Sequence, residues 1–289
     1  MEYNKPSSKL SVITINRNNV EGLRQTIKSV ISQTFSDYEY IVIDGASTDS
    51  SLDVIKEYAD EITYWVSELD SGIYNAMNKG IGVAKGEYLY FLNSGDWLYN
   101  ENVLENVFSE NRSEDFLYGN ICFVKSDLNF HLTNYPKEIS FLLFYSEGGL
   151  CHQAVFHKRH LFKDKLYNEH FKIYSDFEFF IQKIFFENYS SFFIDKVICN
   201  YDENGISATE DEKTLNIYAK ERHQILTSFF PEKILQDYDL LVKYEQEARL
   251  TIMKRIRFIM NKPKLYVILR KTVKLIVLIA SIFDRKKAN

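Results

Sequence analysis

The first ninety residues alternate short apolar runs rich in Val, Ile and Tyr with segments whose apolar residues recur at helical spacing. The runs are typical of buried strands, and the spacing is typical of amphipathic helices. We expect strands over residues 10–16, 40–44, 62–66 and 87–92, and helices over 20–32, from 47–49 onward, and over 73–84. This alternation predicts βαβ units, and therefore an α/β fold with a mainly parallel central sheet flanked by helices.

Beyond residue 100 the pattern is less regular. The predicted elements are one or two strands over 115–124, a helix over 139–145, a strand over 153–157, a helix over 176–186 and a strand over 191–199. From residue 210 onward nearly the whole chain is expected to be helical, with Pro231 and Pro263 marking helix starts or breaks.

Composition excludes several classes of protein. The three cysteines, Cys122, Cys151 and Cys199, are widely spaced and form no C-x-x-C pair, which argues against a disulfide framework or a zinc site. No apolar stretch occurs in the first ten residues, so we expect no secretory signal and a reducing, cytoplasmic setting.

The net charge of −5 hides an uneven distribution. Residues 251–289 contain 11 lysines and arginines and one acid, a net charge of +10. The other 250 residues carry 24 basic and 39 acidic side chains, a net charge of −15. We therefore expect no nucleic-acid partner, whereas the basic tail is suited to an anionic surface.

Polar side chains follow the predicted strands at their carboxyl ends, where open α/β sheets bind ligands. Asn16 and Asp44 end the first two strands, and Asp96 follows the fourth. Asp44 there can accept hydrogen bonds from a base or a ribose, and Asp96 is placed for a hard divalent cation that also touches phosphate. Each carboxylate has an alternative interpretation, as a residue that caps a helix or closes a turn.

A dense polar segment over residues 67–80 opens the third predicted helix. Glu68 and Asp70 are candidates for binding hydroxyl groups, and Lys79 is a candidate for offsetting phosphate charge. Alternatively, Ser71 caps the helix and Lys79 belongs to a solvated face. Neither G-x-G-x-x-G nor G-x-x-x-x-G-K-[ST] occurs, which removes the main support for a NAD site or a P-loop.

Together these motifs resemble glycosyltransferase family 2, the inverting enzymes with a GT-A fold. The resemblance covers about residues 10–201 and is densest before Asp96. The matching features are a first strand with Thr14 at its end, IVIDGASTD over 41–49, DSGIYNAMNKGI over 70–81, AKGEY over 84–88 and FLNSGD over 91–96. Their order and spacing look most like the members that build bacterial O-antigen and capsule repeat units.

The resemblance implies a GT-A, Rossmann-like domain over residues 1–209, with a nucleotide-binding half over about 1–100 and an acceptor half over about 101–209. Residues 210–289 would form a helical C-terminal extension.

The resemblance also implies the donor side of the site. The residues expected to hold the nucleotide sugar are Thr14, Asn16, Asp44, Asp70, Lys79 and Asn93. Asp96 falls on the last Asp of the family's D-x-D-type motif and would bind Mn²⁺ or Mg²⁺ against the diphosphate. The sequence departs from the family here, because Asn93 and Gly95 stand where other members carry acids. One protein carboxylate then remains for the cation, with phosphate oxygens and waters in its other positions.

An inverting transfer needs a carboxylate that removes the acceptor hydroxyl's proton as the oxygen attacks the anomeric carbon. The run YSDFEFF over 174–180 resembles the family's acidic pair at a helix start. Asp176 takes the position of the catalytic base, with Glu178 as a second acid and Ser175 where a Glu is frequent. The alternative is that Asp176 caps the following helix.

The CHQ run over 151–153 also resembles the family's acceptor-side segment. His152 and Gln153 would then lie on the side of the acceptor and the diphosphate. The alternative is a structural role for His152.

The basic tail contains an apolar stretch that Arg270, Lys271 and Lys274 interrupt, leaving residues 275–283 as its longest clean part. That part is far shorter than the roughly 20 residues needed to span a bilayer. An apolar helix flanked by Lys and Arg is typical of an interfacial helix on an anionic leaflet. The alternative is a helix packed on the domain with its basic groups in water.

We therefore expect an inverting, metal-dependent glycosyltransferase that moves a sugar from a UDP-sugar to a hydroxyl of a lipid-linked saccharide. Its setting would be surface polysaccharide synthesis, in the cytoplasm and peripheral on the inner face of a bacterial membrane. One alternative is a non-catalytic sugar-nucleotide-binding or scaffold protein at the membrane. Another is a sugar nucleotidyltransferase, which needs a Gly- and Arg-rich phosphate loop where this sequence offers only Arg17.

Overall fold

The computed structural model describes residues 7–125, 130–203 and 212–262 of the chain. It divides into two compact units, Met1–Phe229 and Phe230–Asn289. The first unit contains the sheet and is described first.

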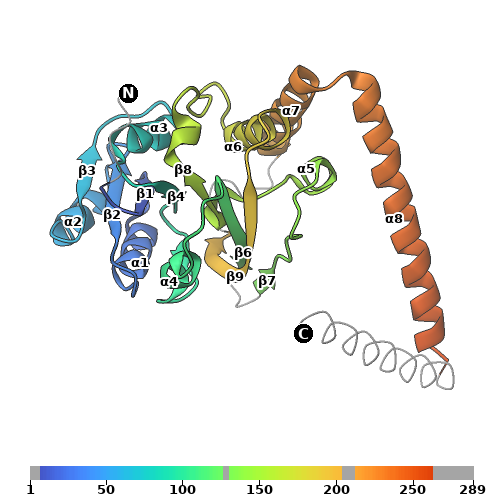
Figure 1. Ribbon diagram of the computed structural model, residues 1–289, viewed down its shortest axis with the longest axis horizontal. Helices are drawn as coiled ribbons and strands as arrows, with labels where there is room; N and C mark the ends of the chain where they lie inside the picture. Colours follow the sequence, from blue (N-terminus) through green and yellow to red (C-terminus); the bar gives the residue numbers. More distant parts are fainter. Residues whose placement is uncertain (1–6, 126–129, 204–211, 263–289) are drawn as a thin grey trace. The chain divides into compact units, whose positions relative to one another are not determined.

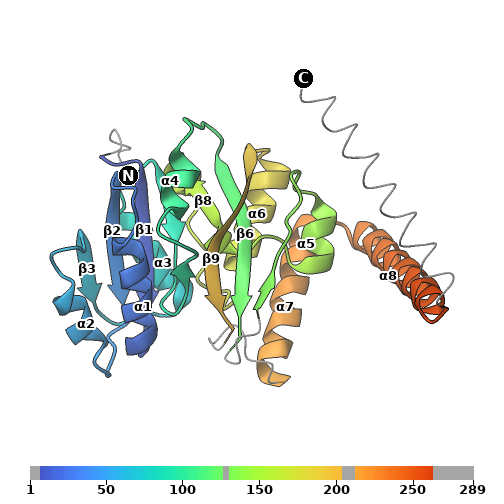
Figure 2. The same ribbon diagram turned by 90° about the horizontal axis from the view of Figure 1, so that it is seen from below.

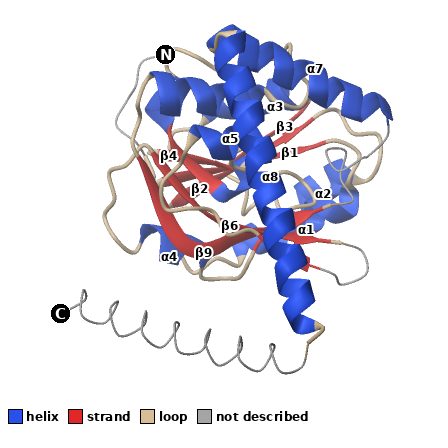
Figure 3. Ribbon diagram, turned by 90° about the vertical axis from the view of Figure 1, so that its right-hand side faces the viewer, coloured by secondary structure: helices blue, strands red, loops and turns tan. Residues whose placement is uncertain are grey.

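The described strands form one nine-stranded sheet in the order β3-β2-β1-β4-β8-β6-β9-β5, with β7 also paired to β6 (Figure 3). The strands are β1 (Leu10–Asn16), β2 (Tyr38–Asp44), β3 (Tyr64–Ser67), β4 (Tyr88–Phe91), β5 (Trp97–Leu98), β6 (Phe116–Val124), β7 (Phe130–Leu132), β8 (Val155–Lys158) and β9 (Ser191–Asp202). The strands β3, β2, β1 and β4 are parallel, as the first ninety residues predict. β8 is antiparallel to both of its neighbours, β4 and β6, and it joins the parallel half of the sheet to the rest.

Helices cover both faces of this sheet, with α1 and α4 on one side and α3 and α6 on the other (Figures 1 and 2). The helices of the first unit are α1 (Val20–Ile31), α2 (Ser51–Glu57), α3 (Ile73–Val83), α4 (Val103–Phe108), α5 (Phe141–Glu147), α6 (Ser175–Phe180) and α7 (Glu212–Phe229). A sheet covered on both faces buries every side chain of its central strands. This explains why β1 and β4 are buried at every position, including the polar residues Ser11, Thr14 and Asn16 of β1.

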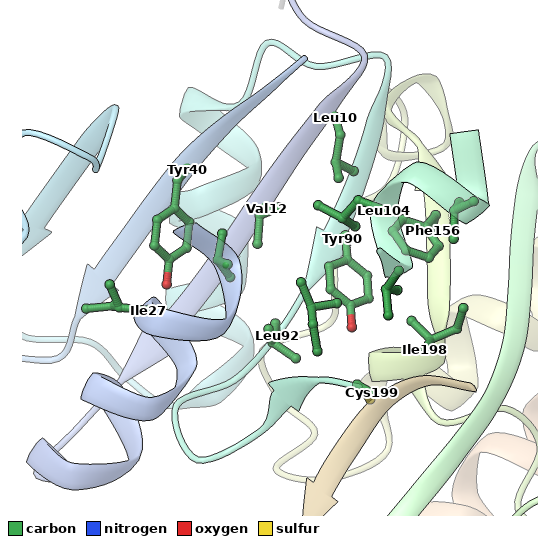
Figure 4. Packing of buried hydrophobic residues seen from close by; sticks show 14 of the residues in the cluster. Leu10, Val12, Ile27, Tyr40, Tyr90, Leu92, Leu104, Phe156, Ile198 and Cys199 are labelled. Carbon is green, nitrogen blue, oxygen red and sulfur yellow. The ribbon is translucent and has the colours of Figure 1, made fainter. Parts of the chain in front are cut away.

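The core between the two halves of the sheet is aromatic. Tyr90 on β4 and Phe156 on β8 are register partners, and their rings stack with centroids 4.4 Å apart (Figure 4). Both side chains are fully buried, and the Tyr90 hydroxyl donates to the carbonyl of Gln153 at 2.8 Å. The buried phenol therefore has the partner that its polar end requires.

Most predicted elements differ from the structure by a few residues at their boundaries, and three of them differ in kind or in where they begin. The strand expected over 153–157 begins as a 3₁₀ turn, His152–Ala154, before β8. The helix expected over 176–186 is α6 followed by a π-helical turn, Ile181–Phe186. The helix expected to open at 47–49 begins at Ser51, because the side chains of this run bond elsewhere: Ser47 contacts Asp44, and the Asp49 carboxylate accepts from the backbone of Val20 and Ser51.

The first unit extends past the predicted domain boundary at residue 209 and includes α7. Ile225 and Leu226 on this helix are buried, and Glu221 accepts hydrogen bonds from the segment that precedes α6. These contacts make α7 part of the compact α/β unit.

The second unit contains α8 (Glu232–Met260), which begins directly after Pro231, as predicted. Within the described part of the chain, no helix is long and apolar enough to cross a membrane. Pro263 and most of the basic tail, residues 263–289, lie outside the described residues.

Candidate active site

The carboxyl ends of β1 and β2 meet in a closed hydrogen-bond network around Asp44. Asp44 is fully buried, and its Oδ1 accepts from Asn16 Nδ2 at 2.8 Å and Ser47 Oγ at 2.5 Å. Its Oδ2 accepts from the Ser47 backbone N–H at 2.9 Å and from Ser67 Oγ at 2.6 Å. Four charge-assisted bonds fill the acceptor capacity of one carboxylate. Asp44 therefore ties together the ends of three parallel strands.

Thr14 and Asn16, the other two residues predicted on these strand ends, differ in whether their polar atoms have hydrogen-bond partners. Thr14 is fully buried, and its hydroxyl bonds with Tyr40 Oη at 3.1 Å. Asn16 is nearly as buried, but its Oδ1 has no hydrogen-bond partner among the described residues. An unpartnered buried acceptor of this kind is costly unless a ligand satisfies it.

The loop that carries Asp70 folds back over the end of β2. The Asp70 side chain is only 6% exposed, and a Cβ added to Gly45 would lie 2.2 Å from its Oδ2. A glycine at position 45 is thus what allows this close approach. The Arg17 guanidinium lies 3.9 Å from Asp70 Oδ1, so a cation stands beside the carboxylate.

Lys79, predicted to offset phosphate charge, contacts this same loop. Its ammonium donates to the Leu69 carbonyl at 2.7 Å and pairs with Glu68 at 2.8 Å. Ser71 does not cap α3; Gly72 is the N-cap residue, with a φ of 140° that favours glycine. Lys79 therefore holds the loop that presents Asp70.

Asp96 lies in the turn after β4 and is 5% exposed. Its Oδ1 accepts from the Asp202 backbone N–H and its Oδ2 from Gln153 Nε2, both at 3.0 Å. Burial raises the pKa of Asp96 to about 7, and the negative charge of Asp202 adds to this effect. A carboxylate whose charge is so poorly solvated is a favourable partner for a cation.

The surroundings of Asp96 fit a hard divalent cation. Asn93 Oδ1 and Gln153 Oε1 are both buried, and neither has a hydrogen-bond partner in the described part of the chain. Amide and carboxylate oxygens are the protein ligands that Mg²⁺ and related cations take. No group of three or more His, Cys, Asp or Glu side chains with metal-site geometry occurs in residues 7–125, 130–203 and 212–262. A cation bound here would have the Asp96 carboxylate and amide oxygens as its candidate protein ligands.

Asp176 lies in the first turn of α6, two residues after the N-cap residue Tyr174, so it does not cap the helix. Its Oδ1 accepts from Tyr74 Oη at 3.0 Å and from the Phe177 backbone N–H at 2.9 Å. Its Oδ2 lies 2.8 Å from His152 Nδ1. The Asp176 side chain is 16% exposed, so the oriented carboxylate stays open to solvent and to a substrate.

His152 connects the two sides of the site. With its Nδ1–H donated to Asp176, its Nε2 is left as the acceptor for Asn93 Nδ2, 3.2 Å away. Asn93 belongs to the same turn as Asp96, and Gln153 follows His152. The structure thus brings together five of the residues singled out in the sequence: Asp176, His152, Gln153, Asn93 and Asp96.

Glu178 lies apart from this group. Its carboxylate is 3.3 Å from Lys165 Nζ, and its Oε2 is buried without a hydrogen-bond partner among the residues described. Two residues along a helix point in different directions, so Asp176 and Glu178 serve different surroundings.

Sequence reasoning missed three residues: Tyr74, which contacts Asp176, Asp202, which contacts Asp96, and Glu221, which binds the backbone that leads into Asp176. Tyr74 lies in the run DSGIYNAMNKGI, and its place among the polar residues Asn75 and Asn78 of a predicted helix could have marked it as a candidate site residue. Asp202 and Glu221 lie far from every motif in the sequence, and only the long-range contacts of β9 and α7 place them here.

Comparison with known proteins gives concordant results. The family Glycosyl transferase family 2 matches residues 11–184. A PGL/p-HBAD biosynthesis glycosyltransferase of Mycobacterium bovis is 30% identical over 211 residues, which cover 70% of this chain and 80% of that protein. The poly(ribitol-phosphate) beta-N-acetylglucosaminyltransferase TarP of Staphylococcus aureus is 40% identical over 114 residues, 37% of this chain and 35% of TarP.

Solved structures share the fold. S. aureus TarS 1–349 in complex with UDP-GlcNAc superposes with a TM-score of 0.60 at 19% identity, over 80% of this chain and 70% of that one. A second TarS 1–349 structure gives 0.56 at 22% identity, and there this chain spans 60% of the TarS chain, which is less than two thirds. The mannosyltransferase PcManGT from Pyrobaculum calidifontis, in complex with GDP-Man and Mn²⁺, gives 0.51 at 17% identity, over 67% of this chain and 56% of that one.

Proposed function

This chain belongs to glycosyltransferase family 2, and from that premise we propose that it transfers a sugar, with inversion, from a UDP-sugar to a hydroxyl of a lipid-linked saccharide. The observation that carries the proposal is the series of contacts from Asp176 through His152 to Asn93, in the turn that holds Asp96. These contacts link the partly exposed carboxylate of Asp176 to the turn that holds the buried carboxylate of Asp96. The UDP-GlcNAc and UDP complexes of TarS support the choice of UDP.

Asp176 is the proposed general base. In the reaction the acceptor oxygen bonds to the anomeric carbon, the bond from that carbon to the diphosphate oxygen breaks, and Asp176 takes the hydroxyl proton. Attack from the face opposite the diphosphate inverts the anomeric configuration. Tyr74 and the Phe177 N–H fix one carboxylate oxygen, and His152 orients the other.

Asp96, with the amide oxygens of Asn93 and Gln153, would hold a divalent cation, Mn²⁺ or Mg²⁺, which when bound would neutralise charge on the leaving diphosphate. The buried, poorly solvated carboxylate and the two unpartnered amide oxygens, Asn93 Oδ1 and Gln153 Oε1, support this assignment.

The donor-side residues divide into two groups in this proposal. Asn16, through its unpartnered Oδ1, and Asp70 contact the nucleotide sugar directly. Asp44, Thr14 and Lys79 act indirectly, because their polar groups already bond to neighbouring protein groups that shape the site.

The decisive test is Asp176→Asn, which keeps the size of the side chain but cannot take a proton at neutral pH. We expect UDP binding near that of the wild type and a turnover lower by roughly 10²- to 10⁴-fold, the usual contribution of a general base. The assay measures UDP released from UDP-GlcNAc, UDP-glucose and UDP-galactose with Mn²⁺. Near-normal turnover of the variant would remove Asp176 from this role, and no turnover by the wild type on any donor would favour the non-catalytic alternative.

We also propose that residues 251–289 dock the enzyme on the anionic inner face of a bacterial membrane, where a lipid-linked acceptor for O-antigen or capsule synthesis would lie. The net charge of +10 around an interrupted apolar stretch supports this. Binding to vesicles should rise with anionic lipid content and weaken with salt, since each basic group near the surface contributes about 1 kcal/mol. Flotation of the full chain against a form ending at Leu250 tests it; equal flotation of both forms would refute it.

A further inference from the structure

A buried carboxylate on α7 binds the backbone segment that leads into Asp176. Glu221 is 8% exposed, and its Oε1 accepts from the Lys172 N–H at 2.7 Å. Its Oε2 accepts from the N–H groups of Ile173 and Tyr174 at 3.0 and 3.1 Å. Three consecutive peptide donors on one carboxylate fix the path of that backbone, because such charge-assisted bonds are about twice as strong as neutral ones.

Helix α3 also contacts the segment 172–174, through Tyr74. The Tyr74 hydroxyl lies within hydrogen-bond distance of the Ile173 carbonyl and of Asp176 Oδ1. Ile173 is therefore held at its N–H by Glu221 and at its carbonyl by Tyr74. A ring contact between Tyr174 and Tyr218, with centroids 5.5 Å apart, adds apolar packing between this segment and α7.

This arrangement extends the site beyond the part of the chain that matches the family. The match ends at residue 184, whereas α7 covers Glu212–Phe229 and lies beside α6 in Figure 1. We propose that Glu221 is a positioning residue for the base: by holding residues 172–174 it sets where the Asp176 carboxylate meets the acceptor hydroxyl. This inference rests on the proposed role of Asp176.

The test uses the full-length chain with Glu221→Gln, which replaces one acceptor oxygen by an NH₂ group that can only donate. We expect kcat for UDP release to fall about 10- to 100-fold, as displacement of a catalytic group by about 1 Å does. The KM for the donor and the Kd for UDP should stay within about twofold, since the donor-side carboxylates Asp44 and Asp70 bond to other elements. Glu212→Gln, the same change at an exposed position of the same helix, is the matched control.

A double-mutant cycle separates positioning from general stabilisation. If Glu221 acts through the base, Glu221→Gln should change turnover by less than about twofold once Asp176 is already Asn, because residues acting as one unit are not additive. An equal loss in both backgrounds, or wild-type kcat in Glu221→Gln, would overturn the inference. Near-normal turnover of Asp176→Asn alone would instead refute the base itself.

A second variant covers the case in which Glu221→Gln does not fold. If Glu221→Gln no longer binds UDP, Glu221→Asp takes its place, since it keeps the buried charge but withdraws the carboxylate by one methylene. We expect it to bind UDP and to lose kcat, again only when Asp176 is present. Full activity of Glu221→Asp would show that the position of this carboxylate does not matter.

Discussion

The end of β2 and the turn after β4 each hold a buried aspartate, but the hydrogen bonding of the two carboxylates differs. Asp44 receives four hydrogen bonds from Asn16, Ser47 and Ser67. Asp96 receives two, and beside it the amide oxygens of Asn93 and Gln153 have no partner within the described residues. A satisfied network makes a region rigid, whereas unsatisfied buried groups cost free energy and are retained mainly where function requires them. Asp44 itself is therefore part of the scaffold, and the turn that holds Asp96 is where we expect the cation.

The largest expected effect on stability comes from breaking the satisfied turn. Asp44→Ala takes a fully buried acceptor away from the donors of Asn16, Ser47 and Ser67. We expect the free energy of unfolding to fall by about 3–5 kcal/mol, because several donors lose a charged acceptor and each polar group left unpaired costs about 1–3 kcal/mol. Urea denaturation of both proteins measures this. A loss below about 1 kcal/mol would contradict the description of Asp44 as scaffold.

A second effect on stability comes from His157 on β8, a buried side chain whose polar atoms, like the amide oxygens near Asp96, lack hydrogen-bond partners among the described residues. It is fully buried among aromatic rings, and neither ring nitrogen has a hydrogen-bond partner in the described chain. Burial lowers its pKa to about 3, from an ordinary 6.5. The unfolded chain therefore binds a proton that the folded chain excludes, so stability is complete above pH 6.5 and falls as the pH drops towards 3.

Linkage gives a loss of about 2 kcal/mol between pH 8 and pH 5 from this group alone. His157→Leu should remove that part of the pH dependence, which denaturation at the two pH values measures. An unchanged pH dependence in the variant would show that the ring is protonated in the folded protein.

A smaller effect is expected at the unsatisfied turn itself. Asp96→Asn removes a buried charge, and rotation of the Gln153 amide would offer its unpartnered Oε1 to the new amide group. In the presence of a chelator we expect the free energy of unfolding to change by no more than about 1 kcal/mol, far less than at Asp44. The rise in melting temperature with Mn²⁺ and UDP should disappear. A variant that keeps this rise would exclude Asp96 as the cation ligand, and a large destabilisation would remove the contrast between the two turns.

The smallest effect is expected at Lys79. Its pair with Glu68 is partly solvated, with side chains 24% and 54% exposed, so Lys79→Met should cost at most about 1 kcal/mol. The Kd for UDP should rise by no more than about threefold, because the ammonium holds the loop and not the phosphate. Calorimetric titration with UDP at two salt concentrations checks this. A large, salt-dependent loss of UDP affinity would show that Lys79 contacts the phosphate, as the sequence predicts.

The sequence predicted the regular part of the molecule well because that part is determined locally. The parallel strands β1 to β4 follow from apolar runs and intervening helical spacing, and Asp44 and Asp96 were found because strand ends are recognisable. Motifs singled out Asp176, His152 and Asn93 one by one, and the structure shows that they contact each other. The sequence could not predict Glu221 or Asp202, because their roles depend on contacts between residues that are distant in the chain. Periodicity also cannot show whether Lys79 pairs with Glu68, as it does in the structure, or binds a phosphate.

The position of β8 in the sheet has a consequence for how the chain is made. β4 ends at Phe91, but its neighbour on the open side, β8, spans Val155–Lys158 and also has to pair with β6. During synthesis at about 5–20 residues per second, the edge of β4 stays unpaired for roughly 3–13 seconds after the strand itself has emerged. An unpaired, apolar strand edge is a template for wrong pairing. The nascent chain should therefore depend most on chaperones in this interval, and slower translation between residues 92 and 155 should lower the yield of folded protein.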